Sequence, residues 1–210
     1  MTVYRLKPKE QMAVPDPWWE PVVTLDPDGI RRWNMDDHYA AINAYELQAS
    51  VPEKVQQAFE TARNLYLYSF FVHQFLMVSE LHVGISVEFA LREKANQQAI
   101  LVGEHWGMKR LIELAIKQRW IVDSGFERFR KQEEHRKHNE EMWPDMFEAM
   151  SPSAKNDPQR YCKLVAEIFP VTRNTLAHGS AMFYHTVLGS FALASDLINQ
   201  VFISDSTATR

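Results

Sequence analysis

Hydrophobic residues recur every three to four positions from residue 53 to the end of the chain, which is the period of an amphipathic helix. No alternating stretch in this part is long enough to predict a strand. The pattern predicts an all-α fold, an up-and-down helical bundle. The expected helices cover residues 53–77, 80–98, 108–120, 158–169 and 180–202, with a charged stretch at 126–150.

The first 52 residues differ from the rest, because six of the ten prolines lie there. Proline interrupts regular elements, so we expect an irregular Pro/Trp-rich N-terminal arm with one short helix at about 34–49, capped by Asn34 or Asp36. Trp18 and Trp19 are large apolar side chains, and we expect them to be buried. The predicted units are the arm (1–52) and the bundle (53–210), with a charged insertion at about 122–157.

Apolar stripes indicate which helix faces point into the core. Pro170 should kink or end the helix at 158–169. The apolar repeat of the last helix fits either the bundle core or a seam between subunits. The expected inward residues are Val83, Val87, Ala90 and Leu91, then Met108, Leu111, Ile112 and Ala115, and finally Tyr161, Leu164, Val165, Ile168 and Phe169.

The composition and net charge of the chain limit the classes of protein to which it can belong. Hydrophobic residues make up 46% and charged residues 24%, as in ordinary globular domains. The net charge of -4 provides no general attraction for nucleic acid or anionic lipid, so an RNA site must be local. The most apolar stretch, 65–78, is too short to span a membrane and predicts a buried helix. One cysteine and no signal-peptide pattern indicate a cytoplasmic protein.

Metal and cofactor chemistry finds little support in the sequence. His135 and His138 lie one helical turn apart, but Arg136 and Lys137 separate them, which favours a solvated helix with pairs such as Glu133 with Lys137. Glycine-rich phosphate loops and zinc-type cysteine pairs are absent from the sequence. Cys162 lies on an apolar stripe and is predicted to be an inert core thiol. We therefore expect neither a metal nor a cofactor.

The segment 171–180 carries the strongest chemical signal. In a helical turn Asn174 and His178 share a face, and the long Arg173 side chain can swing alongside. Arginine supplies a permanent charge for phosphate oxygens, histidine moves a proton near neutral pH, and asparagine orients either group. The structural alternative is an ion-pairing Arg173 with Asn174 and His178 as helix caps.

The run from Arg173 through Asn174 to His178 resembles the Arg-Asn-x-x-x-His motif of the HEPN superfamily, helical domains that include prokaryotic RNases of toxin–antitoxin and phage-defence systems. Glu88 and Arg92 resemble acidic and basic positions of a preceding helix in that family. The resemblance covers about 53–203. It implies a homodimer that cleaves RNA without a metal and leaves a cyclic phosphate, with Arg173 and His178 as the catalytic pair and Asn174 as their support.

The motif itself offers little positive charge, because Arg173 is the only lysine or arginine between Lys163 and Arg210. RNA binding would therefore need basic residues from other parts of the chain. The alternative is a non-catalytic HEPN-like module that binds a nucleotide or a partner protein, with the arm as a docking element. An antitoxin is a further expected partner of a toxin-type RNase; a membrane is not. The candidate RNA-binding residues are Arg92, Lys94, Lys109 and Arg110.

Overall fold

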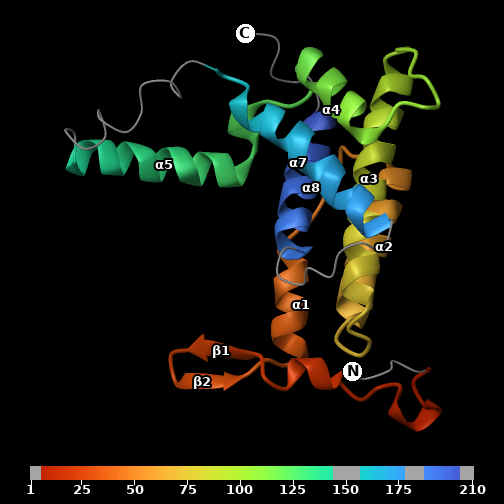
Figure 1. Cartoon of the computed structure of the whole chain (residues 1–210), viewed down its shortest axis with the longest axis vertical. Coiled ribbons are helices and arrows are strands. Elements are labelled where there is room, and N and C mark those ends of the chain that lie inside the picture. The colour runs from red at the N-terminus through yellow and green to blue at the C-terminus, as the bar shows by residue number, and fades with distance from the viewer. Residues whose placement is uncertain (1–5, 144–156, 178–186, 204–210) are drawn as a thin grey trace.

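The computed structural model describes residues 6–143, 157–177 and 187–203 (Figure 1). It is mostly helical, as the sequence pattern predicts. A two-stranded hairpin, β1 (Val23–Asp26) and β2 (Gly29–Arg32), is its only sheet within those ranges. The described α-helices are α1 (Met35–Asn43), α2 (Glu53–Tyr68), α3 (Phe75–Gln97), α4 (Met108–Lys117), α5 (Glu127–Met142), α7 (Arg160–Ala177) and α8 (Val187–Val201).

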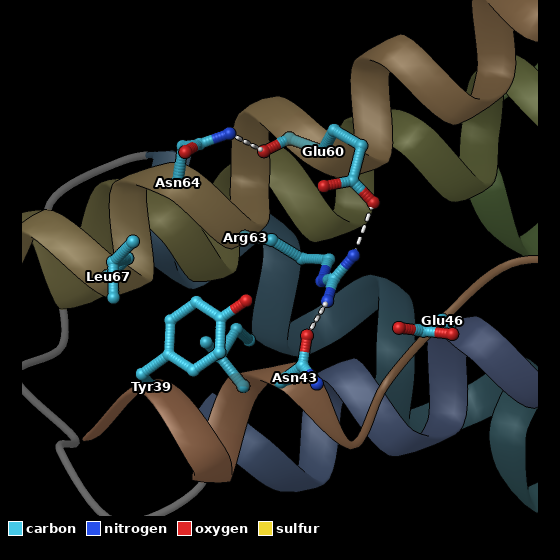
Figure 2. A pocket seen from close by; sticks show the side chains of 8 residues that line it. Tyr39, Asn43, Glu46, Glu60, Arg63, Asn64 and Leu67 are labelled. Atoms are coloured by element: carbon cyan, nitrogen blue, oxygen red, sulfur yellow. Dashed lines mark hydrogen bonds and ion pairs between the residues drawn. The ribbon is translucent and has the colours of Figure 1, made fainter. Parts of the chain in front are cut away.

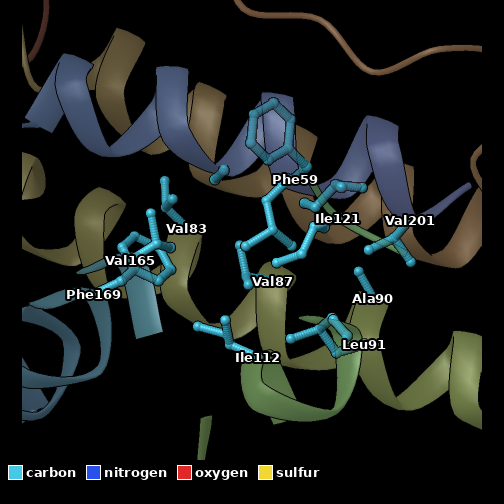
Figure 3. Packing of buried hydrophobic residues seen from close by; sticks show 14 of the residues in the cluster. Phe59, Val83, Val87, Ala90, Leu91, Ile112, Ile121, Val165, Phe169 and Val201 are labelled. Carbon is cyan, nitrogen blue, oxygen red and sulfur yellow. The ribbon is translucent and has the colours of Figure 1, made fainter. Parts of the chain in front are cut away.

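Helix α3 is the centre of the bundle. It runs beside α2 along its length and packs against α8, while α7 crosses it and also contacts α4 (Figure 1). The stripes predicted for α3 and α4 are all buried, because these helices meet the core on those faces. Figure 3 shows side chains from several helices interlocking around α3; among them are Phe59, Val83, Val87, Leu91, Ile112, Ile121, Val165 and Phe169.

The boundary between α2 and α3 differs from the prediction. Helix α2 ends at Tyr68 and α3 begins at Phe75, so the stretch 65–78 contains a turn and is not one buried helix. The arm stabilises this turn. The Asp16 backbone N–H donates to the Phe70 carbonyl at 2.9 Å, and the Asp16 carboxylate accepts from the His73 backbone N–H at 3.2 Å. The local spacing of hydrophobic residues cannot reveal a contact between segments so far apart in the sequence.

Helix α7 continues through Pro170 to Ala177, so of the two effects predicted for Pro170, ending the helix near 169 is wrong. Pro170 and its neighbour Phe169 are both buried, and this packing holds the chain helical where a hydrogen bond is lost. The first turn is fixed from outside the helix. The buried Asp123 carboxylate accepts from the backbone N–H groups of Tyr161 and Cys162 at 2.9 and 2.8 Å.

The inward face of α7 also differs in part from the expected one. Leu164 and Ile168 are 51% and 55% exposed, whereas Cys162, Val165 and Phe169 are buried against α3 and α4. The helix is apolar over more than one face, so its stripe alone could not fix the orientation. Burial raises the pKa of the Cys162 thiol well above its usual range, which agrees with an inert core thiol.

Helix α8 belongs to the bundle core. Phe191, Leu197 and Ile198 are completely buried within their own chain. The apolar repeat of α8 therefore belongs to the core of its own chain. It is not available as a contact surface between two subunits, so it gives no support to a dimer. The first part of the predicted helix, 180–186, lies outside the described residues.

The arm contains more regular structure than expected. The hairpin turns at Pro27–Asp28, and Gly29 adopts a φ of +126°, which favours glycine. Helix α1 begins with Asn34 as its N-cap, as predicted, and its side chain accepts from the backbone N–H of Asp37. Arg31 pairs with both Asp26 and Asp37 and thereby links the hairpin to α1.

Two tryptophans anchor the arm unequally. Trp19 is partly buried, and its Nε1–H donates to the Ser69 carbonyl at 3.1 Å. Trp18 stacks on His73 at 4.4 Å but remains 46% exposed, so the expected burial is wrong for this residue. One face of Trp18 covers the turn between α2 and α3, and the remainder meets solvent.

Two buried histidines make the packing of the arm sensitive to pH. His38 Nε2–H donates to the Tyr66 carbonyl at 2.9 Å, which leaves Nδ1 to accept from the Trp33 indole N–H at 3.4 Å. This arrangement requires a neutral ring. Burial lowers the pKa of His38 and of His73 below the ordinary value of about 6.5.

We predict that the melting temperature falls by a few degrees as the pH decreases from 7.5 to 5.5. Below about pH 6.5 the unfolded chain binds protons that the folded histidines exclude, so acid favours unfolding. Thermal melts across this range measure how steeply the melting temperature depends on pH. This dependence should become smaller in His38→Gln and stay unchanged in His105→Gln, where the side chain is exposed. A melting temperature that rises on acidification would contradict this assignment.

Helix α5 projects sideways from the bundle and buries none of its residues (Figure 1). It is stabilised by its own charges, as predicted, although Glu133 pairs with Arg136 at 2.9 Å rather than with the expected Lys137. Arg136 pairs with Glu140 as well. None of the helices in the described ranges combines the length and apolar composition that a membrane crossing requires.

Candidate functional site

The predicted motif begins on the last turns of α7, where that helix meets α3. Arg173 points toward α3, and its Nη2 lies 3.5 Å from Glu88 Oε2. Its Nη1 donates to Asn174 Oδ1 at 3.3 Å, so the structure brings two of the three motif residues together. His178 lies outside the described residues.

Gly84 makes room for Arg173. A Cβ atom at Gly84 would lie 2.7 Å from Arg173 Cγ and 3.2 Å from its Cβ, closer than side chains approach one another. The absence of a side chain on α3 therefore allows the Arg173 stem to pass along the helix toward Glu88. Sequence reasoning missed this residue, and its only signal was a glycine inside a strongly periodic helix.

Glu88 joins two arginines. Its Oε1 accepts from Arg92 Nη2 at 3.1 Å, while its other oxygen faces Arg173. Arg92 also donates to the Trp106 carbonyl at 2.6 Å, which ties it to the loop before α4. Because two guanidinium groups share one carboxylate, this cluster carries one net positive charge in a chain that is acidic overall.

The Arg173 guanidinium is held loosely. Its contacts of 3.3 and 3.5 Å are at the limit of hydrogen bonding, and its buried Nε makes no hydrogen bond with any described residue. The side chain is 32% exposed, so solvent reaches it. A phosphate oxygen, which accepts from guanidinium at about 2.7–2.9 Å, can therefore compete for these donors.

The four candidate RNA-binding residues separate into two groups. Arg92 is part of the cluster with Glu88, and Lys109 and Arg110 begin α4 nearby. Lys109 pairs with Glu167 of α7 at 2.6 Å, which neutralises its charge. Lys94 points away from this group, since it lies over the Phe202 ring at 5.8 Å. The structure thus brings Arg92, Lys109 and Arg110 toward the motif and leaves Lys94 apart.

Metal-type chemistry has no recognisable site in the described ranges. No group of three or more histidine, cysteine or acidic side chains in these ranges could hold an ion. His135 and His138 are exposed on α5, which projects away from the crossing of α3 and α7 (Figure 1).

A shallow pocket of about 240 Å³ lies between α1 and α2, away from the motif. Figure 2 shows the Arg63 guanidinium between two partners inside it, Glu60 at 2.5 Å and Asn43 at 3.3 Å. The contact with Asn43 joins α1 to α2, whereas Glu60 lies on α2 with Arg63. Because the Arg63 guanidinium is already bound by Glu60 and Asn43, we assign the pocket a structural role.

No family model matches this chain, and no curated protein or solved structure shows significant similarity to it. The motif and the side chains around it are therefore the features that bear on function.

Proposed function

We propose that this chain is a HEPN-type endoribonuclease that acts as a homodimer without a metal. The observation that supports this proposal best is the partly exposed, loosely held Arg173 guanidinium beside Asn174. The opposite expectation, a surface ion pair that only stabilises the fold, fits less well. Such a pair would not need a glycine beneath the arginine stem.

In the proposed reaction the ribose 2′-oxygen forms a bond to the adjacent phosphorus, and the bond to the 5′-oxygen breaks. One proton leaves the 2′-hydroxyl and another is delivered to the 5′-oxygen, so that a cyclic phosphate and a 5′-hydroxyl result. Arg173 stabilises the negative charge that develops on the phosphate oxygens. We assign the proton transfers to His178 on the resemblance, and Asn174 orients these groups.

The homodimer is proposed on the resemblance and on an exposed apolar face of α7. The exposed apolar side chains of α7, Leu164, Ile168 and Val171, recur at intervals of four and three residues on the helix that carries the motif. A second copy that covers them would bury this apolar face of α7, while Arg173 points the other way, toward α3. Light scattering at micromolar concentration should then give twice the mass of the chain.

The non-catalytic HEPN-like module remains the alternative. Two observations favour it: Glu88 already neutralises part of the Arg173 charge, and the chain as a whole is acidic. In that function the same residues bind a nucleotide or a partner protein without cleaving RNA. A role in toxin–antitoxin or phage-defence systems follows from the resemblance and applies to the catalytic form.

The deciding experiment is incubation of the purified, folded protein with total RNA, with and without EDTA. We expect shortened RNA in both samples, because the proposed site uses only side chains. Loss of cleavage with EDTA would contradict the metal-independent mechanism. Intact RNA in both samples, with the protein shown to be folded and dimeric, would favour the binding module.

A further inference from the structure

The loop between α3 and α4 presents an aromatic ring covered by a cation. Arg110 lies over the Trp106 indole, with its Cζ 4.4 Å from the ring centroid. Trp106 is partly buried against the core, whereas Arg110 is exposed. The indole therefore restrains the guanidinium, which stays accessible to solvent.

Arg110 differs from the other basic residues near the motif. Arg92 and Arg173 share Glu88, and Lys109 pairs with Glu167. Across the described part of the chain, Arg110 has no acidic partner at ion-pair distance. Its charge is thus held in place by the indole without an acidic partner among the described residues.

The Trp106–Arg110 pair lies next to the motif. Arg92 contacts Glu88 with the same nitrogen that donates to the Trp106 carbonyl at 2.6 Å, and Glu88 faces Arg173. Met108, between Trp106 and Arg110, has its Cε 3.6 Å from the Cβ position at Gly84, beside the Arg173 stem. A chain of contacts therefore links the loop that carries Trp106 to the position of Arg173.

We propose that Trp106 and Arg110 form a stacking subsite for a base of single-stranded RNA, next to the phosphate that Arg173 holds. This inference rests on the proposed function. A base stacks on the accessible plane of Arg110, and the guanidinium charge attracts the neighbouring phosphate. Since every base presents a flat face, the subsite selects unpaired RNA rather than a particular base.

The test uses a short single-stranded RNA whose 2′-hydroxyls are methylated, so that it binds without being cleaved. Fluorescence anisotropy at low salt measures its affinity for the full-length protein. We expect Arg110→Ala to weaken binding about tenfold, the effect of losing one stacked contact. Arg110→Lys keeps the charge but loses the plane, so it should also bind clearly more weakly than the wild type.

The matched control is Lys117→Ala, which removes one exposed positive charge two turns further along α4. It should bind nearly as well as the wild type. Equal weakening by Lys117→Ala, or wild-type binding by Arg110→Lys, would overturn the stacking subsite in favour of diffuse electrostatic attraction. Double-stranded RNA bound as tightly as single-stranded RNA would also overturn it.

Failure of the subsite and failure of the proposed function give different results. If the wild type cleaves RNA while Arg110→Ala binds the methylated RNA normally, the subsite is wrong and the nuclease stands. If the wild type does not bind the methylated RNA at low salt, the subsite is wrong whatever the cleavage assay shows. A surface that instead captures a partner protein would give that second result.

Discussion

Arg173→Ala should lower RNA cleavage at least about 100-fold and leave the fold intact. Removing a charged donor aimed at the reacting phosphate costs about 10²- to 10³-fold in rate. The effect on stability should be small, because the contacts of Arg173 with Glu88 and Asn174 are long and the side chain is partly exposed. Gel assays with RNA measure the rate, and thermal melts measure the stability.

The matched control is Arg160→Ala, which removes an exposed arginine from the first turn of the same helix. It should cleave like the wild type. His178→Ala should lose about 10²- to 10⁴-fold, the contribution of a general acid or base. Full activity in Arg173→Ala would show that this arginine only stabilises the fold and would remove the main support for the proposed site.

Gly84→Ala should reduce cleavage by about 100-fold, although Gly84 itself contacts no RNA in the proposed site. The added methyl would lie 2.7 Å from Arg173 Cγ, so the arginine stem must move. Displacing a reacting group by about 1 Å is enough for a loss of this size. Alanine favours the helix more than glycine does, which offsets part of the cost of moving the Arg173 stem, and thermal melts measure the net change in stability.

The control for this substitution is Gly189→Ala on α8, where the new Cβ meets nothing within 4 Å. The same exchange there should leave the cleavage rate unchanged. If Gly84→Ala cleaves like Gly189→Ala, the position of Arg173 against α3 does not matter for the reaction. That outcome would contradict the geometry proposed here even if Arg173 itself proved essential.

The sequence predicted the bundle well where the inward residues recur at the helical period. The stripes of α3 and α4 are buried as expected, because their apolar residues follow the helical period without interruption. The prediction failed where distant segments decide the outcome. The turn between α2 and α3 depends on Asp16, and the start of α7 depends on Asp123, both far away in sequence.

The candidate site was predictable in its chemistry and only partly in its surroundings. The motif spacing identified Arg173 and Asn174, and the structure brings them together with Glu88 and Arg92. The roles of Gly84 and Trp106 depend on how α7 and α4 cross α3, which no local pattern encodes. The hairpin of the arm was missed because its strands span four residues each.

The most direct test of the nuclease proposal is the chemical identity of the RNA ends after digestion in the presence of EDTA. Mass spectrometry of a short RNA substrate distinguishes the possibilities. We predict a cyclic phosphate on one fragment and a 5′-hydroxyl on the other, since the 2′-oxygen is the attacking group. Fragments with 5′-phosphate ends, or an RNA left whole by folded protein, would contradict the proposed mechanism.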